Sequence, residues 1–131
     1  MPAAYAIARM YPEPRIHDDA LTYMERIQAT MDPFGGKFLV HGGVPDVKEG
    51  EFPGVVVILG FPDAASARAW YDSEPYAEIK RLRADHIPGD LFLLEGVDAD
   101  YDVAKTAAEL RRQRDAADAA ASAGTAGTAS E

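Results

Sequence analysis

Residues 55–83 read VVVILGFPDAASARAWYDSEPYAEIKRLR, and this stretch decides the fold. Its first seven residues are almost wholly apolar, which predicts a strand that is covered on both faces. Asp63 then stands where a helix N-cap is expected. The residues after it place Ala67, Trp70 and Tyr71 on one helical face. A buried strand that leads into a helix indicates a domain of mixed α and β structure.

Three further strands are predicted on either side of this stretch. Residues 4–10 (AYAIARM) form a short strand in which Tyr5, Ile7 and Arg9 share one face. Residues 37–41 (KFLVH) form the second strand and residues 90–97 (DLFLLEGV) the fourth. The polar residues 44–54, with two prolines, predict a loop or an irregular hairpin between the second and third strands.

One more helix is predicted between the first and second strands. Asp18 or Asp19 would cap it, and it would run to about residue 31. Leu21, Met24, Ile27 and Gln28 are close to helical spacing. Pro33 and the following glycine pair would end this helix.

The predicted order is strand, helix, strand, strand, helix, strand, the βαββαβ order of an α+β ferredoxin-like fold. Two helices cover only one face of a four-stranded sheet, yet three of the predicted strands carry apolar side chains on both faces. A second copy of the same sheet, packed across a two-fold axis, would cover the other face. The sequence therefore predicts a homodimer.

Composition narrows the class of protein. The chain has 131 residues and a formal net charge of −9, and this excess of acids argues against a nucleic-acid binder. It has no cysteine, which excludes disulfides and thiolate chemistry. The longest purely apolar run is five residues, far short of the roughly 20 that a membrane span needs. No signal peptide is recognised, so we expect a cytoplasmic protein.

The composition changes near residue 98. The last 34 residues contain 12 alanines and few large apolar side chains, so they cannot form a core. We interpret residues 1–97 as one domain, and residues 98–131 as an Ala-rich tail that is partly helical or disordered.

Four stretches together resemble a known family: AYAIARM, FGGKFLVHGG, VVVILGFPDAASARAWYDSEPYAEIKRLR and LFLLEGV. Over residues 3–97 the chain resembles the family called domain of unknown function 1330. That family is similar to the dimeric α+β barrel superfamily, in which two ferredoxin-like protomers pack sheet to sheet. The resemblance implies a dimer and a pocket between sheet and helices. The superfamily includes cofactor-independent oxygenases, cyclases and ligand-sensing domains, so the resemblance indicates fold more than function.

The chain departs from the family pattern at two positions. His41 stands where the family usually has Arg, and Gly60 stands where it usually has Glu. The resemblance implies that such an Arg and Glu on neighbouring strands would form an ion pair, which this chain would lack. An imidazole replaces a permanent cation, so we interpret His41, in phase with Lys37 and Leu39, as a candidate acid or base.

The candidate catalytic residues are His41, Arg83, His86 and Asp85. His41 ends a strand, while Asp85 and His86 follow the second helix and could reach toward it. Three of them also have a structural interpretation. His41 could donate a hydrogen bond to a loop carbonyl, His86 could be a cation favoured by the helix C-terminus, and Arg83 could pair with Glu78 or Glu95.

The candidate substrate-binding residues are aromatic or basic. Trp70, Tyr71 and Tyr76 come from the family's aromatic segment, although Trp and Tyr at helical spacing are more often core residues. Arg9 shares a predicted face with two apolar residues, which is rare for a charge without a partner. The full set is Tyr5, Arg9, Tyr11, Trp70, Tyr71 and Tyr76.

No cofactor or metal site is predicted. The three histidines lack a metal-ligand spacing, His17 is expected at the surface, and no nucleotide-binding glycine motif is present. The first hypothesis is a cofactor-independent cyclase or isomerase that acts by proton transfer on a polyketide-like or aromatic secondary metabolite. The alternatives are a dimer that binds a small ligand or acts as a scaffold without catalysis, and a cofactor-free monooxygenase.

Overall fold

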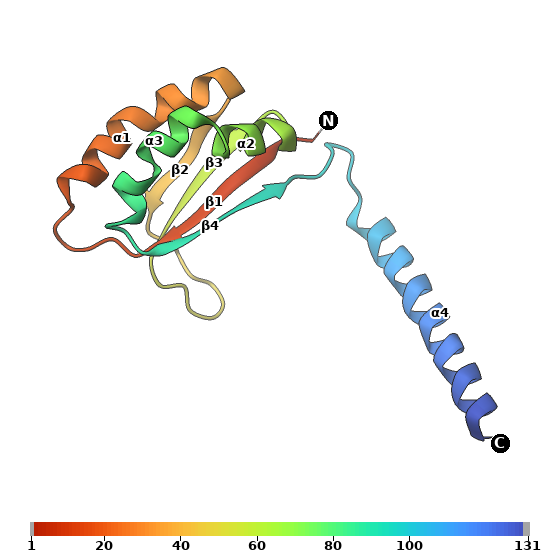
Figure 1. Cartoon of the computed structure of the whole chain (residues 1–131). Helices are drawn as coiled ribbons and strands as arrows, with labels where there is room; N and C mark the ends of the chain where they lie inside the picture. The colour runs from red at the N-terminus through yellow and green to blue at the C-terminus, as the bar shows by residue number, and fades with distance from the viewer. Residues whose placement is uncertain (1, 130–131) are drawn as a thin grey trace. The chain divides into compact units, whose positions relative to one another are not determined.

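The computed structural model describes residues 2–129, and the side chains of residues 2–124. The chain forms two compact units, Met1–Asp98 and Ala99–Glu131. In the first unit, four antiparallel strands make one sheet with the order β2-β3-β1-β4. Its strands are β1 (Ala4–Met10), β2 (Lys37–Gly43), β3 (Val55–Phe61) and β4 (Gly89–Glu95). Helices α1 (Asp18–Met31), α2 (Ala64–Tyr71) and α3 (Glu74–Ala84) lie on one face of this sheet (Figure 1).

The ferredoxin-like α+β fold predicted from the sequence is confirmed. β1 and β3 have the predicted bounds, but the predicted second helix is two helices, α2 and α3. The break falls at Asp72 and Ser73, where the Ser73 hydroxyl accepts a hydrogen bond from the Tyr76 N–H. Pro75 follows in the first turn of α3, and a proline there cannot continue a preceding helix.

Helix α1 starts and packs differently from the prediction. Its N-cap is His17, whose Nδ1 accepts the Asp19 N–H at 2.9 Å, so neither aspartate caps it. Leu21 and Met24 are 40% and 41% exposed. The buried stripe instead follows another set of positions at helical spacing: Ala20, Tyr23, Ile27, Thr30 and Met31.

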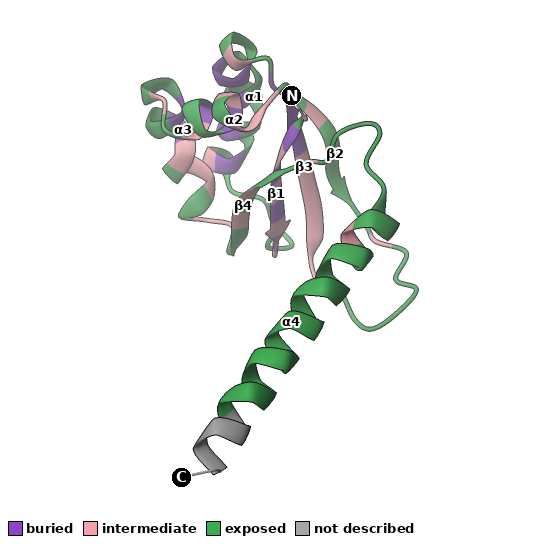
Figure 2. Cartoon of the chain, turned by 90° about the vertical axis from the view of Figure 1, so that its right-hand side faces the viewer, coloured by how far each residue is buried: buried purple, intermediate pink, exposed green. Residues whose placement is uncertain are grey.

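The two faces of β1 differ in side-chain size. Ala4, Ala6, Ala8 and Met10 are buried toward the helices, and the residues between them lie on the opposite face. Figure 2 shows the buried residues gathered on β1 and on the helices. Small side chains therefore occupy the covered face of this central strand.

The face of the sheet away from the helices carries an apolar row across all four strands. Val40 pairs with Ile58, Ile58 with Ile7, and Ile7 with Phe92. Phe92 is 49% exposed and Leu94, beside it in the next row, is 54% exposed. We call this surface the open face.

A bulge in β2 changes the predicted phase of His41. The register shifts between Phe38 and Val40, so His41 pairs with Val57. His41 therefore shares the helix-covered face with Phe38, rather than a face with Lys37 and Leu39 as alternation predicted.

Gly60 lies on the other side of the sheet from His41. It pairs with Lys37 and Tyr5, and an added Cβ there would meet the Leu39 side chain at 2.9 Å. The two positions that the family resemblance linked as a lost ion pair are thus separated by the sheet.

The second unit contains α4 (Val103–Ala129). The Asp102 side chain accepts the Ala104 N–H at 2.9 Å and caps the helix start. Apart from Thr106, the described side chains of α4 are exposed, as its lack of an apolar stripe predicted. The division into a domain and a tail stays a prediction. None of the helices within residues 2–129 has the length and apolar character of a membrane span.

Candidate functional site

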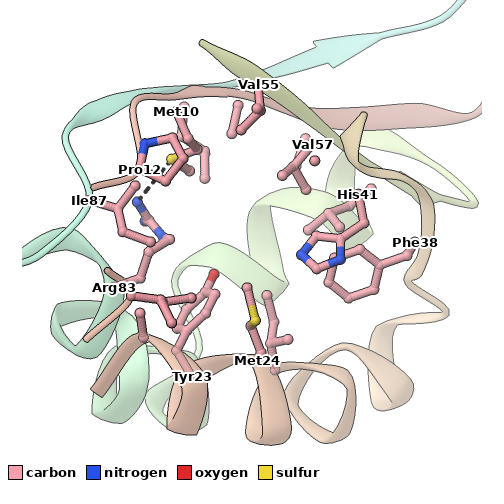
Figure 3. A pocket seen from close by; sticks show the side chains of 18 residues that line it. Met10, Pro12, Tyr23, Met24, Phe38, His41, Val55, Val57, Arg83 and Ile87 are labelled. Atoms are coloured by element: carbon pink, nitrogen blue, oxygen red, sulfur yellow. Dashed lines mark hydrogen bonds between the residues drawn. The ribbon is translucent and has the colours of Figure 1, made fainter. Parts of the chain in front are cut away.

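A cavity of about 410 Å³ lies between the sheet and helices α1 and α3 (Figure 3). Its walls are mostly apolar, with Tyr23, His41 and Arg83 as the polar side chains. This combination is typical of small-molecule sites. The lining residues, which come from all four strands, helices α1 and α3 and adjoining loops, include Ala6, Ala8, Met10, Ile16, Met24, Phe38, Val57 and Leu91.

The cavity exists because short side chains line its floor and wall. Ala6 and Ala8 of β1 and Ala20 of α1 all border it. A side chain that stops at Cβ cannot reach across the roughly 10 Å that separates packed layers. The space that a leucine or phenylalanine would fill is therefore left open.

Arg83 reaches into the cavity from the last turn of α3 without an anionic partner. Its Nη1 lies 3.8 Å from the Met10 Sδ, and its Cζ lies 5.4 Å from the centroid of the Tyr23 ring. Its Nε is buried and has no hydrogen-bond partner, and no carboxylate forms an ion pair with it among the described residues.

The charge of Arg83 is retained despite partial burial. Burial lowers the pKa of its guanidinium, but the Tyr23 and Tyr76 hydroxyls raise that pKa by more, so the net direction is upward. The Nε–H is nevertheless a buried donor without a partner, and an unsatisfied buried donor costs free energy. An anionic or electron-rich oxygen placed in the cavity would satisfy this donor.

Tyr23 supplies the second polar group. Its hydroxyl lies 2.9 Å from the hydroxyl of Tyr76, which is fully buried. Burial, with the Tyr76 hydroxyl next in importance, raises the pKa of Tyr23 well above its ordinary value, so it stays a neutral phenol. When Tyr76 donates to Tyr23, the Tyr23 proton is free to point toward a ligand.

His41 lies on the side of the cavity opposite Arg83 (Figure 3). Its ring packs edge-on against Phe38, with 5.3 Å between centroids. Its imidazole makes no hydrogen bond within the described part of the chain, so the loop-carbonyl interpretation finds no support. A ligand that spans the cavity would contact both His41 and Arg83.

The other two candidate catalytic residues point elsewhere. Asp85 is the C-cap of α3 and forms an ion pair with Arg81 at 3.3 Å. The His86 Nε2 lies 3.0 Å from the Asp19 Oδ2, and its ring stacks on His17. Neither residue lines the cavity or contacts His41.

None of the six candidate substrate-binding residues lines the cavity, and three of them, Tyr5, Arg9 and Tyr11, lie on β1 or directly after it. Tyr5 and Arg9 belong to the open face of β1, because the helix-covered positions are the alanines between them. Arg9 pairs there with Asp90 at 3.3 Å and lies 5.7 Å from the ring centroid of Tyr11.

The aromatic segment is core. Trp70 is fully buried and donates to the Thr30 hydroxyl at 3.0 Å. Tyr71 packs on that core and holds the Lys80 ammonium 4.6 Å from its ring centroid. Tyr76 supports the cavity only through its hydrogen bond to Tyr23.

Sequence reasoning missed Tyr23 and Met10. Tyr23 lies four residues before Ile27 and three after Ala20, a spacing that would have placed it on the buried stripe. Met10 follows Ala4, Ala6 and Ala8 in strand alternation. Large apolar side chains do not mark the covered face in these two elements. The helix-facing side of β1 consists of alanines and Met10, and the buried stripe of α1 includes Ala20 and Tyr23.

The residues that form the sheet, its helices and the cavity match a known protein family. The model of the family described as domain of unknown function (DUF1330) matches residues 3–97. The chain belongs to this family. No curated protein matches the chain.

One solved structure supports the fold of this DUF1330 chain, and a more distant one is also similar to it. The protein of unknown function RPA0582 from Rhodopseudomonas palustris is 15% identical, with a TM-score of 0.58 over 74% of this chain and 84% of that one. SnoaB, a cofactor-independent oxygenase from Streptomyces nogalater, is 10% identical, with a TM-score of 0.49 over 78% of this chain and 100% of that one. The likeness to RPA0582 concerns fold alone, and the likeness to SnoaB supports no argument about this chain.

Proposed function

We propose that the chain is a cofactor-independent enzyme that acts by proton transfer on an apolar, oxygen-rich small molecule. The observation that carries this proposal is the apolar cavity of about 410 Å³ with the unpaired Arg83 at one side. A polyketide-like or aromatic molecule with an enolisable carbonyl matches both the apolar walls and the cation. Cyclisation or isomerisation through an enolate is the reaction class that this arrangement supports best.

The polar groups divide the work of such a reaction. His41, as a neutral imidazole, would take a proton from the carbon next to the carbonyl and return it at another position. The electron pair of the broken C–H bond moves onto the carbonyl oxygen. Arg83 and the Tyr23 hydroxyl would stabilise that oxyanion by donating hydrogen bonds in a site with little water.

Replacement of His41 by alanine tests the catalytic assignment. With an enolisable polyketone or pyrone as substrate, we expect kcat to fall by roughly a hundredfold or more while KM stays nearly constant. Lys37→Ala, in the same strand but off the cavity, is the matched control. Wild-type kcat in the His41→Ala variant would remove His41 from the mechanism.

A second candidate function is ligand binding without catalysis. It is favoured by the exposure of His41 and by the lack of a hydrogen bond that would orient its ring. Saturable binding without any change in the bound molecule would support this function. Oxygen uptake during turnover would instead indicate a monooxygenase.

We propose further that two copies of the chain associate through the open face. Ile7, Ile58 and Phe92 form the centre of its apolar row, and Arg9 and Asp90 form a polar pair beside it. Burial of such a face against its own copy is the least demanding way to remove it from water. The mass of the protein in solution tests this. Ile7→Asp should convert a dimer into a monomer, whereas Val44→Asp, which lies off the sheet, should leave the dimer intact. A monomeric wild type at micromolar concentration would contradict the proposal.

A further inference from the structure

We propose that His17, Asp19 and His86 form a binding site for a first-row transition metal ion such as Zn²⁺. His17 is the N-cap of α1, Asp19 lies in the first turn of that helix, and His86 follows the end of α3. The fold thus brings together two imidazoles and a carboxylate from segments 67 residues apart. Two histidines and one carboxylate are a donor set that binds zinc and related ions, with positions left for water.

The distances suit one shared ion. The Asp19 Oδ2 lies 3.0 Å from the His86 Nε2 and 3.8 Å from the His17 Nδ1. One ligand atom from each of the three residues lies within 4.8 Å of the others. Bonds of about 2.0–2.1 Å in a tetrahedron separate neighbouring ligand atoms by about 3.3–3.4 Å. The two observed contacts fall on either side of that value.

The side chains are free to make the adjustment that binding needs. The two imidazole rings stack, with 3.7 Å between centroids and 9° between planes, and both would have to tilt toward one ion. The side chains of His17 and Asp19 are about half exposed, so rotation there meets little resistance. The His17 Nδ1 would lose the hydrogen bond that it accepts from the Asp19 N–H as the N-cap of α1. The ion would be a stronger partner for that lone pair.

The electrostatic surroundings of His17, Asp19 and His86 do not strongly disfavour a bound cation. The N-terminus of α1 disfavours positive charge, whereas the C-terminus of α3, beside His86, favours it, so the two helix ends offset each other. His17 and His86 line a second hollow of about 150 Å³ together with Glu13 and Arg15. The carboxylate of Glu13 could supply a further oxygen ligand there. Among the residues that line this hollow, Arg15 is the one with a permanent positive charge.

The site adjoins the ligand cavity and is independent of the proposed reaction. Pro12, Ile16 and Ile87 line both hollows, so a metal ion here would lie beside the cavity wall. The proton-transfer proposal uses Arg83, Tyr23 and His41, none of which belongs to the metal-binding set. Failure of one proposal therefore leaves the other intact.

Calorimetric titration of the untagged full chain with Zn²⁺, and optical titration with Co²⁺, test the site. We expect one ion per chain, a Co²⁺ spectrum typical of nitrogen and oxygen ligands, and no competition from Mg²⁺. His17→Asn keeps an N-cap side chain and His86→Gln keeps a hydrogen-bonding partner for Asp19, so both variants should fold. Each should weaken binding by at least about tenfold, as even the loss of an outer partner does.

The third histidine provides the matched control. His41→Ala removes an exposed imidazole that is not part of the site, so the Zn²⁺ affinity of this variant should equal that of the wild type. The thermal midpoint of each variant without metal shows that it is folded. No saturable Zn²⁺ binding by the wild type, or binding that survives in the folded His17→Asn and His86→Gln variants, would overturn the proposal.

Discussion

The layer between the sheet and the helices has a packed end and a hollow end. At the packed end, Phe61 of β3 and Trp70 of α2 lie 5.3 Å apart between ring centroids, and Tyr76 of α3 lies 4.3 Å from Trp70. At the hollow end, the same β3 strand contributes Val55 and Val57 to the wall of a cavity. Tyr23 belongs to both ends and links them through Tyr76.

One sheet thus borders both a packed core and an open cavity. The helix-facing residues of β1 are alanines, except for Met10 at its end. The space between sheet and helices is therefore filled only where the helices supply large side chains. Helix α2 supplies Trp70 and Ala67 to the packed end. At the hollow end the helices supply Ala20, Met24 and the guanidinium of Arg83, which leave this end unfilled.

The largest expected effect is on the packed end. Trp70→Ala should lower the free energy of unfolding by about 3–5 kcal/mol, because it opens a large void and leaves the Thr30 hydroxyl without its donor. Met24→Ala at the hollow end should cost far less, since Met24 already borders open space. Urea denaturation measures both. Equal losses would mean that the two ends are packed alike.

The next effect is on binding at the hollow end. Arg83→Met should weaken binding of an anionic ligand by about 1.5–3 kcal/mol, or roughly 10- to 150-fold, because it removes a charge-assisted hydrogen bond. Stability without ligand should not fall, since Arg83 has no ion pair to lose. Arg81→Met, an exposed change on the same helix, is the control for isothermal titration. Unchanged affinity in Arg83→Met would mean that Arg83 does not contribute to ligand binding in the cavity.

The fold could be predicted from sequence further than the site could. Alternation in β1 and the apolar run in β3 gave their bounds, because these patterns depend on local geometry. Alternation could not say which face of β1 meets the helices, so Tyr5 and Arg9 were assigned to a site from which the sheet separates them. The role of Tyr23 depends on contacts with Tyr76 and Arg83, more than 50 residues away in the chain.

The two ends should also respond in opposite ways to the same substitution in one strand. Ala8→Leu should fill the cavity, block ligand binding, and leave stability unchanged or higher, since each buried methylene contributes about 0.8 kcal/mol. Ala4→Leu on the same face should overpack the core and cost about 1–3 kcal/mol. Denaturation and ligand titration on both variants check this. A stability loss in Ala8→Leu equal to that in Ala4→Leu would contradict an open cavity.

The smallest expected effect concerns pH at the packed end. Asp63 accepts the Ser66 N–H at 2.7 Å, and this hydrogen bond holds the pKa of its carboxyl below the ordinary value. The stabilisation is thus present above the unfolded pKa of about 3.9 and is lost as the pH falls through the folded value. Asp63→Asn keeps a cap that does not titrate. The stability difference between wild type and Asp63→Asn should shrink between pH 5 and pH 3; a constant difference would contradict this assignment.

The central claim is that the hollow end binds an electron-rich oxygen at Arg83, and NMR of the Arg83 Nε–H signal tests it most directly. That proton is buried and has no partner in the structure. Titration with aromatic carboxylates and enolisable polyketones should move this signal in a saturable way in the wild type, together with signals of Tyr23. The same titration should leave the signal unmoved in Ala8→Leu. An unmoved Arg83 signal in the wild type, while compounds bind elsewhere on the chain, would contradict the account.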